Sequence, residues 1–198
     1  MHAAPSVSIL PCDLPHNFSC QLPYFMPAIR SIQQTDIAAV TALYAHHVLH
    51  GTGTFEIDPP GEAEMAARIT DVLAKNLPYL VAEKDGQLLG FAYCNWFKPR
   101  PAYRFSAEDS IYMATEASGK GWGRLLLAEL LVRAEATGVR KLVAVIGDSA
   151  NASSIGVHRA AGFVPVGVLK SMGWKLGQWR DIVLMEKPLG DGDTTDPT

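Results

Sequence analysis

The sequence predicts a single α/β domain with a mixed, mostly antiparallel, twisted sheet of about seven strands and about four flanking helices. Three observations lead to this class. The chain has 198 residues, 48% of them hydrophobic, which is enough for one sizeable core. Segments of strand type and of helix type alternate along its length. Asp85-Gly86 between two apolar runs is a strong signal for a hairpin, and therefore for antiparallel strands.

The first predicted elements are a short strand and two helices. The strand is expected at residues 28–33, and Thr35 can cap the helix that follows it. Apolar residues recur in that helix at helical spacing, namely Ile37, Val40, Tyr44 and Val48. The run Gly51-Thr-Gly-Thr ends the helix, and a second helix is expected over residues 62–75.

The predicted hairpin comes next, with strands at residues 79–83 and 88–96. After a loop, a further strand is expected at residues 107–114. A helix then runs from Leu125 to about Ala136, and the leucines along one of its faces are assigned to the core.

The last predicted elements are a buried strand, a short helix and two closing strands. Residues 139–146 have the apolar composition of a buried strand, and a helix over residues 151–161 ends at Gly162. Two strands close the chain, at residues 163–172 and 180–186. The sequence contains no internal repeat.

The domain boundaries follow from composition. Residues 1–25 are expected to be a disordered extension, residues 26–189 the single domain, and residues 190–198, rich in Gly, Asp and Thr, a flexible tail. Residues 1–25 hold four prolines and no Lys or Arg, so they do not resemble a secretory signal.

Charge and cysteine content exclude several function classes. A net charge of −3 gives no general attraction to nucleic acid or to an anionic membrane. No apolar run approaches the ~20 residues of a membrane span. The three cysteines (Cys12, Cys20 and Cys94) are an odd number without metal-ligand spacing, which fits a reduced cytosol. We therefore expect a cytoplasmic protein without a metal site and with no nucleic-acid or membrane partner.

Residues 118–124 form the most informative segment. Glycines at alternate positions (Gly119, Gly121 and Gly123) let the backbone approach a ligand closely and turn its N–H groups outward. The positive end of the dipole of the following helix adds to this site. The spacing fits neither a Walker loop nor a dinucleotide fingerprint. The segment therefore predicts a phosphate cradle of another kind, formed by Ser118, Gly119, Lys120, Gly121, Trp122, Gly123 and Arg124.

Several separate motifs, in the right order, resemble one known family. The cradle and the segment at residues 151–163 (NASSIGVHRAAGF) resemble the GNAT acetyltransferase superfamily. Residues 107–112 (AEDSIY), 143–147 (VAVIG) and 173–181 (GWKLGQWRD) resemble phosphinothricin N-acetyltransferases within it, which are related to methionine sulfoximine and sulfone acetyltransferases. The likeness covers about residues 29–189 and implies the GNAT fold. One departure is Ser118, where the family often has Gln or Arg; because peptide N–H groups do most of the phosphate binding, little change in affinity is expected.

The resemblance implies direct transfer of an acetyl group from acetyl-CoA to an amine in a ternary complex, without an acyl-enzyme. The reaction needs a base, an oxyanion donor and an acid. Glu108 is the candidate base, acting directly or through a water. The alternative is a structural carboxylate at the start of a strand, paired with a neighbour such as Arg104. Asp109, the next residue, should point to the opposite side of the strand.

His158 is the second candidate catalytic residue. It lies seven residues after Asn151, where many GNAT enzymes have a tyrosine that protonates the departing thiolate. An imidazole with a pKa near ~6.5 is able to orient water or donate that proton. A helical histidine is more often a surface or packing residue, and the other five are assigned to that class. The family places a histidine here, which favours a functional role as acid, base or orienting group.

The coenzyme contacts implied by the resemblance extend beyond the cradle. The backbone of Ile111, Tyr112 and Met113 is expected to pair with the pantetheine arm as an added strand does, with the Met113 N–H holding the thioester oxygen. Asn151 is expected near the thiol end, and Ser154 is a further expected coenzyme contact. The alternative for Asn151 is an N-cap of the helix it starts, and both roles can hold at once.

The loop at residues 97–104 is expected to select the acceptor. Lys98, Arg100 and Tyr103 match the family's acceptor-binding positions, and cations beside the base suit a small anionic amino acid such as phosphinothricin. The alternative is a solvated basic loop. The remaining acceptor contacts are expected from Phe55, Ser110 and Ile182.

Rival functions are methionine sulfoximine or sulfone acetylation, acetylation of a protein or peptide amine, and a non-catalytic acyl-CoA-binding module. A nucleophilic mechanism through Cys94 is disfavoured, because the residue lies in mid-strand without an evident histidine partner. Relatives in the family are homodimers, so a homodimer is expected here.

Overall fold

The computed structural model describes residues 26–197, so the expected disorder of residues 1–25 lies outside the described part. The strands are β1 (Ala28–Ser31), β2 (Tyr79–Lys84), β3 (Gln87–Trp96), β4 (Ser106–Met113), β5 (Lys141–Gly147), β6 (Val164–Lys175) and β7 (Gln178–Pro188). The helices are α1 (Ile37–His50), α2 (Glu62–Ala74), α3 (Trp122–Ala136) and α4 (Ala152–Ala160), with short 3-10 turns η1 (Gln34–Asp36), η2 (Pro101–Tyr103) and η3 (Thr115–Ala117).

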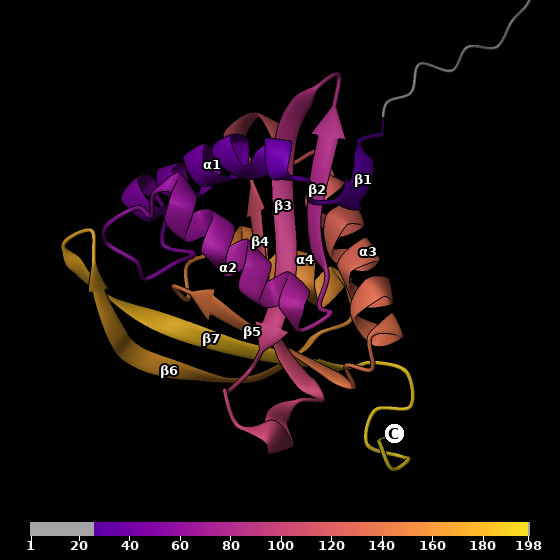
Figure 1. Ribbon diagram of the computed structural model, residues 1–198. Coiled ribbons are helices and arrows are strands. Elements are labelled where there is room, and N and C mark those ends of the chain that lie inside the picture. The colour runs from indigo at the N-terminus through magenta and orange to yellow at the C-terminus, as the bar shows by residue number, and fades with distance from the viewer. Residues whose placement is uncertain (1–25, 198) are drawn as a thin grey trace, which may run out of the picture.

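The seven strands form one mixed sheet in the order β1-β2-β3-β4-β5-β7-β6. Every neighbouring pair is antiparallel except β4 and β5, which are parallel and joined by the crossover helix α3. Helices α1 and α2 cover one face of the sheet, and α3 and α4 cover the other (Figure 1). The predicted fold class is confirmed.

The core lies between the sheet and these two layers of helices. The leucine face of α3 is part of it, since Leu126, Leu127 and Leu130 are fully buried. On the sheet, Leu80 and Phe91 are fully buried as well. These residues fix α3 against the face of the sheet beside β4, the strand that carries the site.

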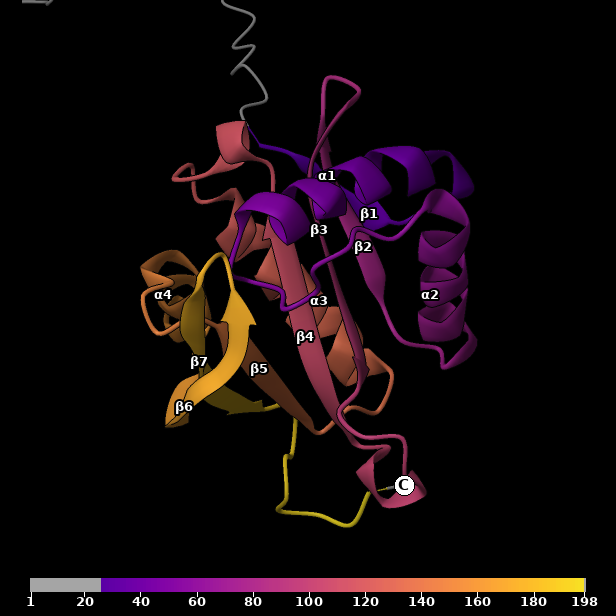
Figure 2. The same ribbon diagram turned by 90° about the vertical axis from the view of Figure 1, so that its left-hand side faces the viewer.

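The central feature of the sheet is the early end of the β4–β5 pairing. The two strands pair from Ser106↔Lys141 to Asp109↔Ala144 and then diverge. Strand β5 continues to Gly147 paired with β7 alone, and β4 continues to Met113 paired with β3 alone. Figure 2 shows the two strands meeting at one end and separating at the other. The result is a V-shaped opening in the sheet whose apex is at Asp109.

Several element boundaries differ from the predicted ones, and those at α3 and at the β6–β7 turn have local reasons. Helix α3 begins at Trp122 and not at Leu125, because Gly121 takes the left-handed conformation (φ 78°) and ends the turn before it. Strands β6 and β7 extend further than predicted, because the tight turn at Leu176-Gly177, with φ of 52° and 70°, twists with the strands that it joins. Near the C-terminus, Arg140 donates to the Thr195 hydroxyl (3.1 Å).

We expect Gly147→Ala to destabilise the protein. A Cβ at Gly147 would lie 2.0 Å from the carbonyl oxygen of Thr52, so the loop between α1 and α2 would have to move. Overpacking of this kind costs about 1–3 kcal/mol of unfolding free energy, measurable by urea unfolding. Gly53→Ala is the matched control, since its nearest neighbour would be 3.9 Å away. Equal stability of the two variants would contradict this reading.

Candidate active site

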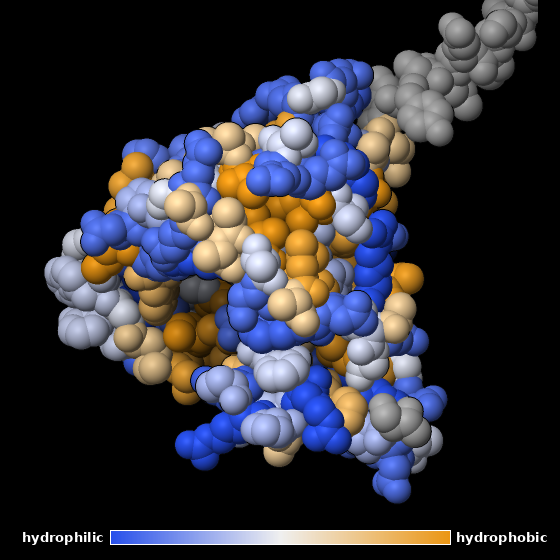
Figure 3. Space-filling model, in the orientation of Figure 1, coloured by the Kyte–Doolittle hydropathy of each residue, from blue (hydrophilic) through white to orange (hydrophobic). Residues whose placement is uncertain are grey.

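A cavity of about 1000 Å³ opens at the V between β4 and β5. Its walls come from the α1–α2 loop (residues 51–61), the divergent parts of β4 and β5, the turn before α3, and α4. The surface in Figure 3 is hollowed between the α1–α2 loop and the β6–β7 hairpin. The cavity therefore lies at the place where the sheet leaves backbone groups unpaired.

The turn at residues 118–121 borders one end of this cavity. Gly119 and Gly121 both have left-handed backbone conformations (φ 73° and 78°), and a Cβ at either would meet open space. The first N–H groups of α3 have no acceptor within the helix and carry the positive end of its dipole. These features fit a phosphate group close to the backbone.

Five of the seven residues predicted for the cradle line the cavity, namely Ser118, Gly119, Gly121, Gly123 and Arg124. Lys120 and Trp122 do not. The Trp122 side chain is buried, and the ammonium groups of Lys84 and Lys120 lie 5.7 and 5.1 Å from its ring centroid. Trp122 therefore contributes to an anion site through its backbone N–H and not through its side chain.

The free edge of β4 forms the floor of the cavity, which Ile111, Tyr112 and Met113 all line. The Ala114 N–H donates to the Leu89 carbonyl in β3 (2.8 Å), so by strand alternation the Met113 N–H points the other way, into the V. A Cβ at Gly123 would lie 3.5 Å from Met113 Cγ. The cradle therefore lies at the Met113 end of the free edge, and the apex at Asp109 lies at the other end.

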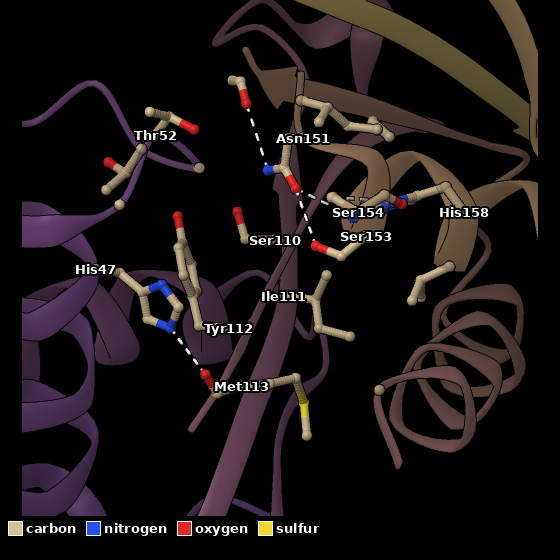
Figure 4. Close-up of a pocket in the computed structure, with 18 of the residues that line it drawn as sticks. His47, Thr52, Ser110, Ile111, Tyr112, Met113, Asn151, Ser153, Ser154 and His158 are labelled. Carbon is tan, nitrogen blue, oxygen red and sulfur yellow. Dashed lines mark hydrogen bonds between the residues drawn. The ribbon is translucent and has the colours of Figure 1, made fainter. Parts of the chain in front are cut away.

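Alternate residues of β4 face opposite sides of the sheet. In Figure 4, Ser110 and Tyr112 point toward His47 and Thr52, whereas Ile111 points toward the side of α4. Glu108 shares the first side by alternation and lines the cavity, and Asp109 lies on the second, as predicted. The two sides of β4 therefore offer separate positions for two ligands.

The surroundings of Glu108 make its carboxyl group a weaker acid than usual. Burial and the neighbouring Asp109 charge raise its pKa, and the Lys98 charge partly opposes this. Arg104, the partner considered from sequence, lies over the Phe105 ring instead, with 4.2 Å between its guanidinium carbon and the ring centroid. Glu108 is thus a half-buried carboxylate at the cavity wall, which suits a proton acceptor.

His158 is buried and bound to the protein through both ring nitrogens. Its Nε2 lies 2.8 Å from Asp109 Oδ2, and its Nδ1 donates to the Ser154 carbonyl oxygen (2.7 Å). Burial lowers the pKa of His158, but the hydrogen bond and charge of Asp109 outweigh it, so the pKa is raised. Both ring nitrogens face oxygen acceptors, an arrangement that favours the imidazolium form and leaves neither N–H group free.

Asn151 and Ser154 line the cavity at the start of α4. Asn151 Oδ1 accepts from the Ser154 backbone N–H (3.2 Å), so the expected N-cap is present. Its Nδ2 lies 3.4 Å from the Gly147 carbonyl oxygen, which ties α4 to the end of β5. These bonds fix the wall of the cavity that faces the free edge of β4.

The residues expected to bind the acceptor divide into two groups. Phe55, Ser110 and Ile182 line the cavity, whereas Lys98, Arg100 and Tyr103 do not. Arg100 and Tyr103 are exposed at the turn η2, and the Lys98 ammonium lies 5.0 Å from the Phe97 ring centroid. Of these three, Lys98 is the one whose charge acts on Glu108.

The structure adds residues that sequence reasoning missed. His47, which the sequence places in the surface or packing class, lines the cavity, and its Nε2 donates to the Met113 carbonyl (2.9 Å). Lys175 is buried and donates to the Thr54 carbonyl (2.6 Å). The Asp109 partner of His158 had a detectable signal, because a carboxylate on the buried face of a strand requires a cation or donors.

Cys94 takes no part in the cavity. It is buried opposite Asp109 in the β3–β4 register, and burial and the Asp109 charge raise its pKa to about 12. A protonated, inaccessible thiol is not a nucleophile. Among residues 26–197, no cluster of three or more His, Cys, Asp or Glu side chains is arranged to hold a metal ion. The described helices include none with the length and apolarity to cross a membrane.

Comparison with known proteins gives one consistent result. A family model described as the acetyltransferase (GNAT) family matches residues 42–163. The chain is 51% identical to a phosphinothricin N-acetyltransferase of Alcaligenes faecalis over 93% of this chain and 94% of that protein. It is 34% identical to an L-methionine sulfoximine/L-methionine sulfone acetyltransferase of Pseudomonas aeruginosa, over 80% of this chain and 92% of that protein.

Solved structures agree with these sequence matches. A GNAT phosphinothricin acetyltransferase from Sinorhizobium meliloti in complex with AcCoA has a TM-score of 0.85 and 44% identity, covering 88% of this chain and 94% of that one. A putative acetyltransferase from Salmonella typhimurium with acetyl-CoA has a TM-score of 0.83 and 30% identity, covering 87% and 98%.

The buried pair predicts a pH-dependent stability. The pKa of His158 is raised in the folded protein, so its stabilisation is complete below the unfolded value of ~6.5 and is lost as pH rises through the folded value. By urea unfolding, His158→Gln should therefore lose about 3 kcal/mol of unfolding free energy at about pH 6, and less at about pH 9. His50→Gln, on an exposed ring, is the control. If the difference in unfolding free energy between the native protein and His158→Gln is the same at the two pH values, the ion pair is contradicted.

Proposed function

This chain belongs to the acetyltransferase (GNAT) family, and from that premise we propose that it transfers the acetyl group of acetyl-CoA to the α-amine of a small anionic amino acid of the phosphinothricin type. The observation that carries the proposal is the half-buried Glu108 at the cavity wall, beside the apex of the V. The phosphinothricin acetyltransferases at 51% and 44% identity support this choice of acceptor.

The geometry of the cavity fits the coenzyme. The open glycine turn and the start of α3 suit the pyrophosphate, and the free edge of β4 suits the amide groups of the pantetheine arm, which add to it as a strand does. Bound in this way, acetyl-CoA supplies an activated thioester. Because the cradle lies at the Met113 end, the arm runs toward Asp109 and brings its acyl end beside Glu108.

The roles of the protein groups follow from this placement. Glu108 takes a proton from the acceptor ammonium, directly or through a water, so that the neutral nitrogen attacks the thioester carbonyl. By the same alternation the Ile111 N–H also points into the V, nearer its apex, and it donates to the carbonyl oxygen, which becomes negative as the new C–N bond forms. The Met113 N–H, expected from the sequence in this role, lies at the cradle end and is left to bind the arm. The C–S bond then breaks and the sulfur leaves with its electron pair. The second proton, which the nitrogen gives up as the amide forms, passes to this sulfur, directly or through a water, to give the free thiol. His158 is placed to hold α4 against β4, because both of its N–H groups have protein acceptors.

The acceptor is placed on the side of β4 that faces the α1–α2 loop. Phe55, Ser110 and Ile182 line this part of the cavity. We propose that the acceptor extends beyond the cavity toward the exposed loop at residues 97–104, where Lys98, Arg100 and Tyr103 bind its anionic groups. Methionine sulfoximine or sulfone is the second candidate acceptor, which the Pseudomonas aeruginosa relative at 34% identity favours.

Turnover and a single carboxylate variant test this function. The purified protein should release coenzyme A with phosphinothricin, and Glu108→Gln should lower kcat by about 100-fold. Because the base acts in its ionised form and its pKa is raised, kcat of the unaltered protein should fall as pH decreases through that value. Glu62→Gln, exposed at the start of α2, is the control.

Parallel assays with methionine sulfoximine, methionine sulfone and a peptide amine distinguish the acceptors. Turnover of none of the small amino acids would reject the proposal. Full activity of Glu108→Gln would remove this residue from the mechanism but not the acceptor assignment.

We also propose that the protein is a cytoplasmic homodimer. The outer strand β6 and its partner β7 expose a row of large apolar side chains, namely Val164, Val166, Val168, Leu169, Met172, Trp174 and Trp179. An exposed apolar edge of this kind is typical of an interface, and a second copy of the chain is the occupant that we propose. The odd number of cysteines favours a reducing compartment.

Val168→Glu should shift the dimer toward monomer, because a charge would be buried at the interface. Analytical ultracentrifugation measures this shift. Val132→Glu is the matched control, since Val132 is an exposed valine on α3, away from the β6 edge. A native protein that sediments as a monomer would contradict the proposal, as would equal dimer stability in both variants.

A further inference from the structure

The α1–α2 loop is a cavity wall without regular structure of its own. Residues 51–61 contain neither helix nor strand, yet Thr52, Thr54 and Phe55 all line the cavity. The position of this wall therefore depends on contacts from other elements. Three sets of contacts hold it, and they differ in how far they are shielded from water.

The two helices that flank the loop hold it by partly exposed contacts. The Tyr44 hydroxyl from α1 lies 3.0 Å from Thr54 Oγ1 and donates to Glu56 Oε1 (3.0 Å). Arg68 from α2 donates to both carboxylate oxygens of Glu56 (2.7 and 3.2 Å). Because the Arg68 and Glu56 side chains are 39% and 35% exposed, solvent weakens this ion pair.

The third contact comes from the β6–β7 hairpin, and its donor is a buried residue. Lys175, at the end of β6, is 5% exposed and donates its ammonium to the Thr54 carbonyl oxygen (2.6 Å). A charged hydrogen bond to a backbone carbonyl away from water is stronger than a neutral one. Burial lowers the pKa of Lys175, and the Glu56 charge partly opposes this, so the carboxylate on the loop helps to keep the ammonium charged.

The loop also packs closely against two glycines. A Cβ at Gly173 would lie 2.6 Å from the Phe55 ring, and a Cβ at Gly147 would lie 2.0 Å from the Thr52 carbonyl oxygen. Lys175 is two residues after Gly173 on the same strand, so both face the same side. The Lys175 ammonium, which binds Thr54, and Gly173, against which the Phe55 ring packs, therefore lie on one surface of the hairpin.

We propose that Lys175 is a positioning residue for the acceptor: by holding the Thr54 carbonyl, it keeps the Phe55 ring against Gly173 and sets the acceptor end of the cavity. This inference rests on the proposed function, in which Phe55 contacts the acceptor. Lys175 does not line the cavity, so we expect the coenzyme site at the cradle and the free edge of β4 to change little when its ammonium is removed.

Lys175→Met tests the inference, because it keeps an unbranched side chain of four heavy atoms and removes the terminal ammonium. The KM for phosphinothricin should rise about tenfold with little change in kcat, the pattern of lost acceptor binding. The Kd for coenzyme A, by calorimetry, should stay within about twofold. Lys175→Arg should restore much of the acceptor KM, and Lys170→Met on the exposed part of the same strand should have no effect on it.

Hydrogen exchange of the loop amides separates this inference from the proposed function. Exchange in residues 51–61 should be faster in Lys175→Met than in the native protein, whether or not phosphinothricin is the acceptor. Unchanged exchange and unchanged KM would overturn the inference, as would equal losses of acceptor and coenzyme binding. If Lys175→Met does not fold, Gly173→Ala displaces the Phe55 ring directly, by a Cβ 2.6 Å from the ring, and should raise the same KM.

Discussion

The early end of the β4–β5 pairing is the constraint on which the site depends. After four residue pairs, from Ser106 to Asp109, the two parallel strands separate, and each keeps a single partner on its outer side. Unpaired backbone groups inside a sheet are costly unless a ligand or water satisfies them. The opening is therefore both a weakness of the sheet and the reason for its function, because the proposed coenzyme arm provides the missing partner strand.

Because side chains alternate along a strand, the two sides of β4 carry carboxylates with different roles. Glu108 faces the α1–α2 loop, where the acceptor is proposed, and Asp109 faces α4, where it binds His158. Two adjacent carboxylates thus have different roles because one is half-exposed to a cavity and the other is paired with a cation. The Asp109 charge also helps to raise the pKa of Glu108, so the buried pair and the proposed base are linked through one peptide unit.

Local sequence signals predicted much of this arrangement. The glycine turn, the Asn151 cap and the leucine face of α3 each depend on residues close in sequence, and each is present. The contacts of Lys175 with Thr54 and of His47 with Met113 join residues far apart in the chain, so no spacing could indicate them. The placement of Lys98, Arg100 and Tyr103 outside the cavity had no local signal either, since a loop's direction depends on what packs beneath it.

Cys94 has a practical consequence for work on this protein. Its thiol is fully buried and stays protonated at neutral pH, because its pKa is about 12. Reagents that detect thiols react with thiolates in solution, so this side chain will neither titrate in a colorimetric assay nor be alkylated while the fold is intact. A thiol-specific dye used to follow coenzyme A release would therefore record no background from this position, and its sudden labelling would report loss of the native core.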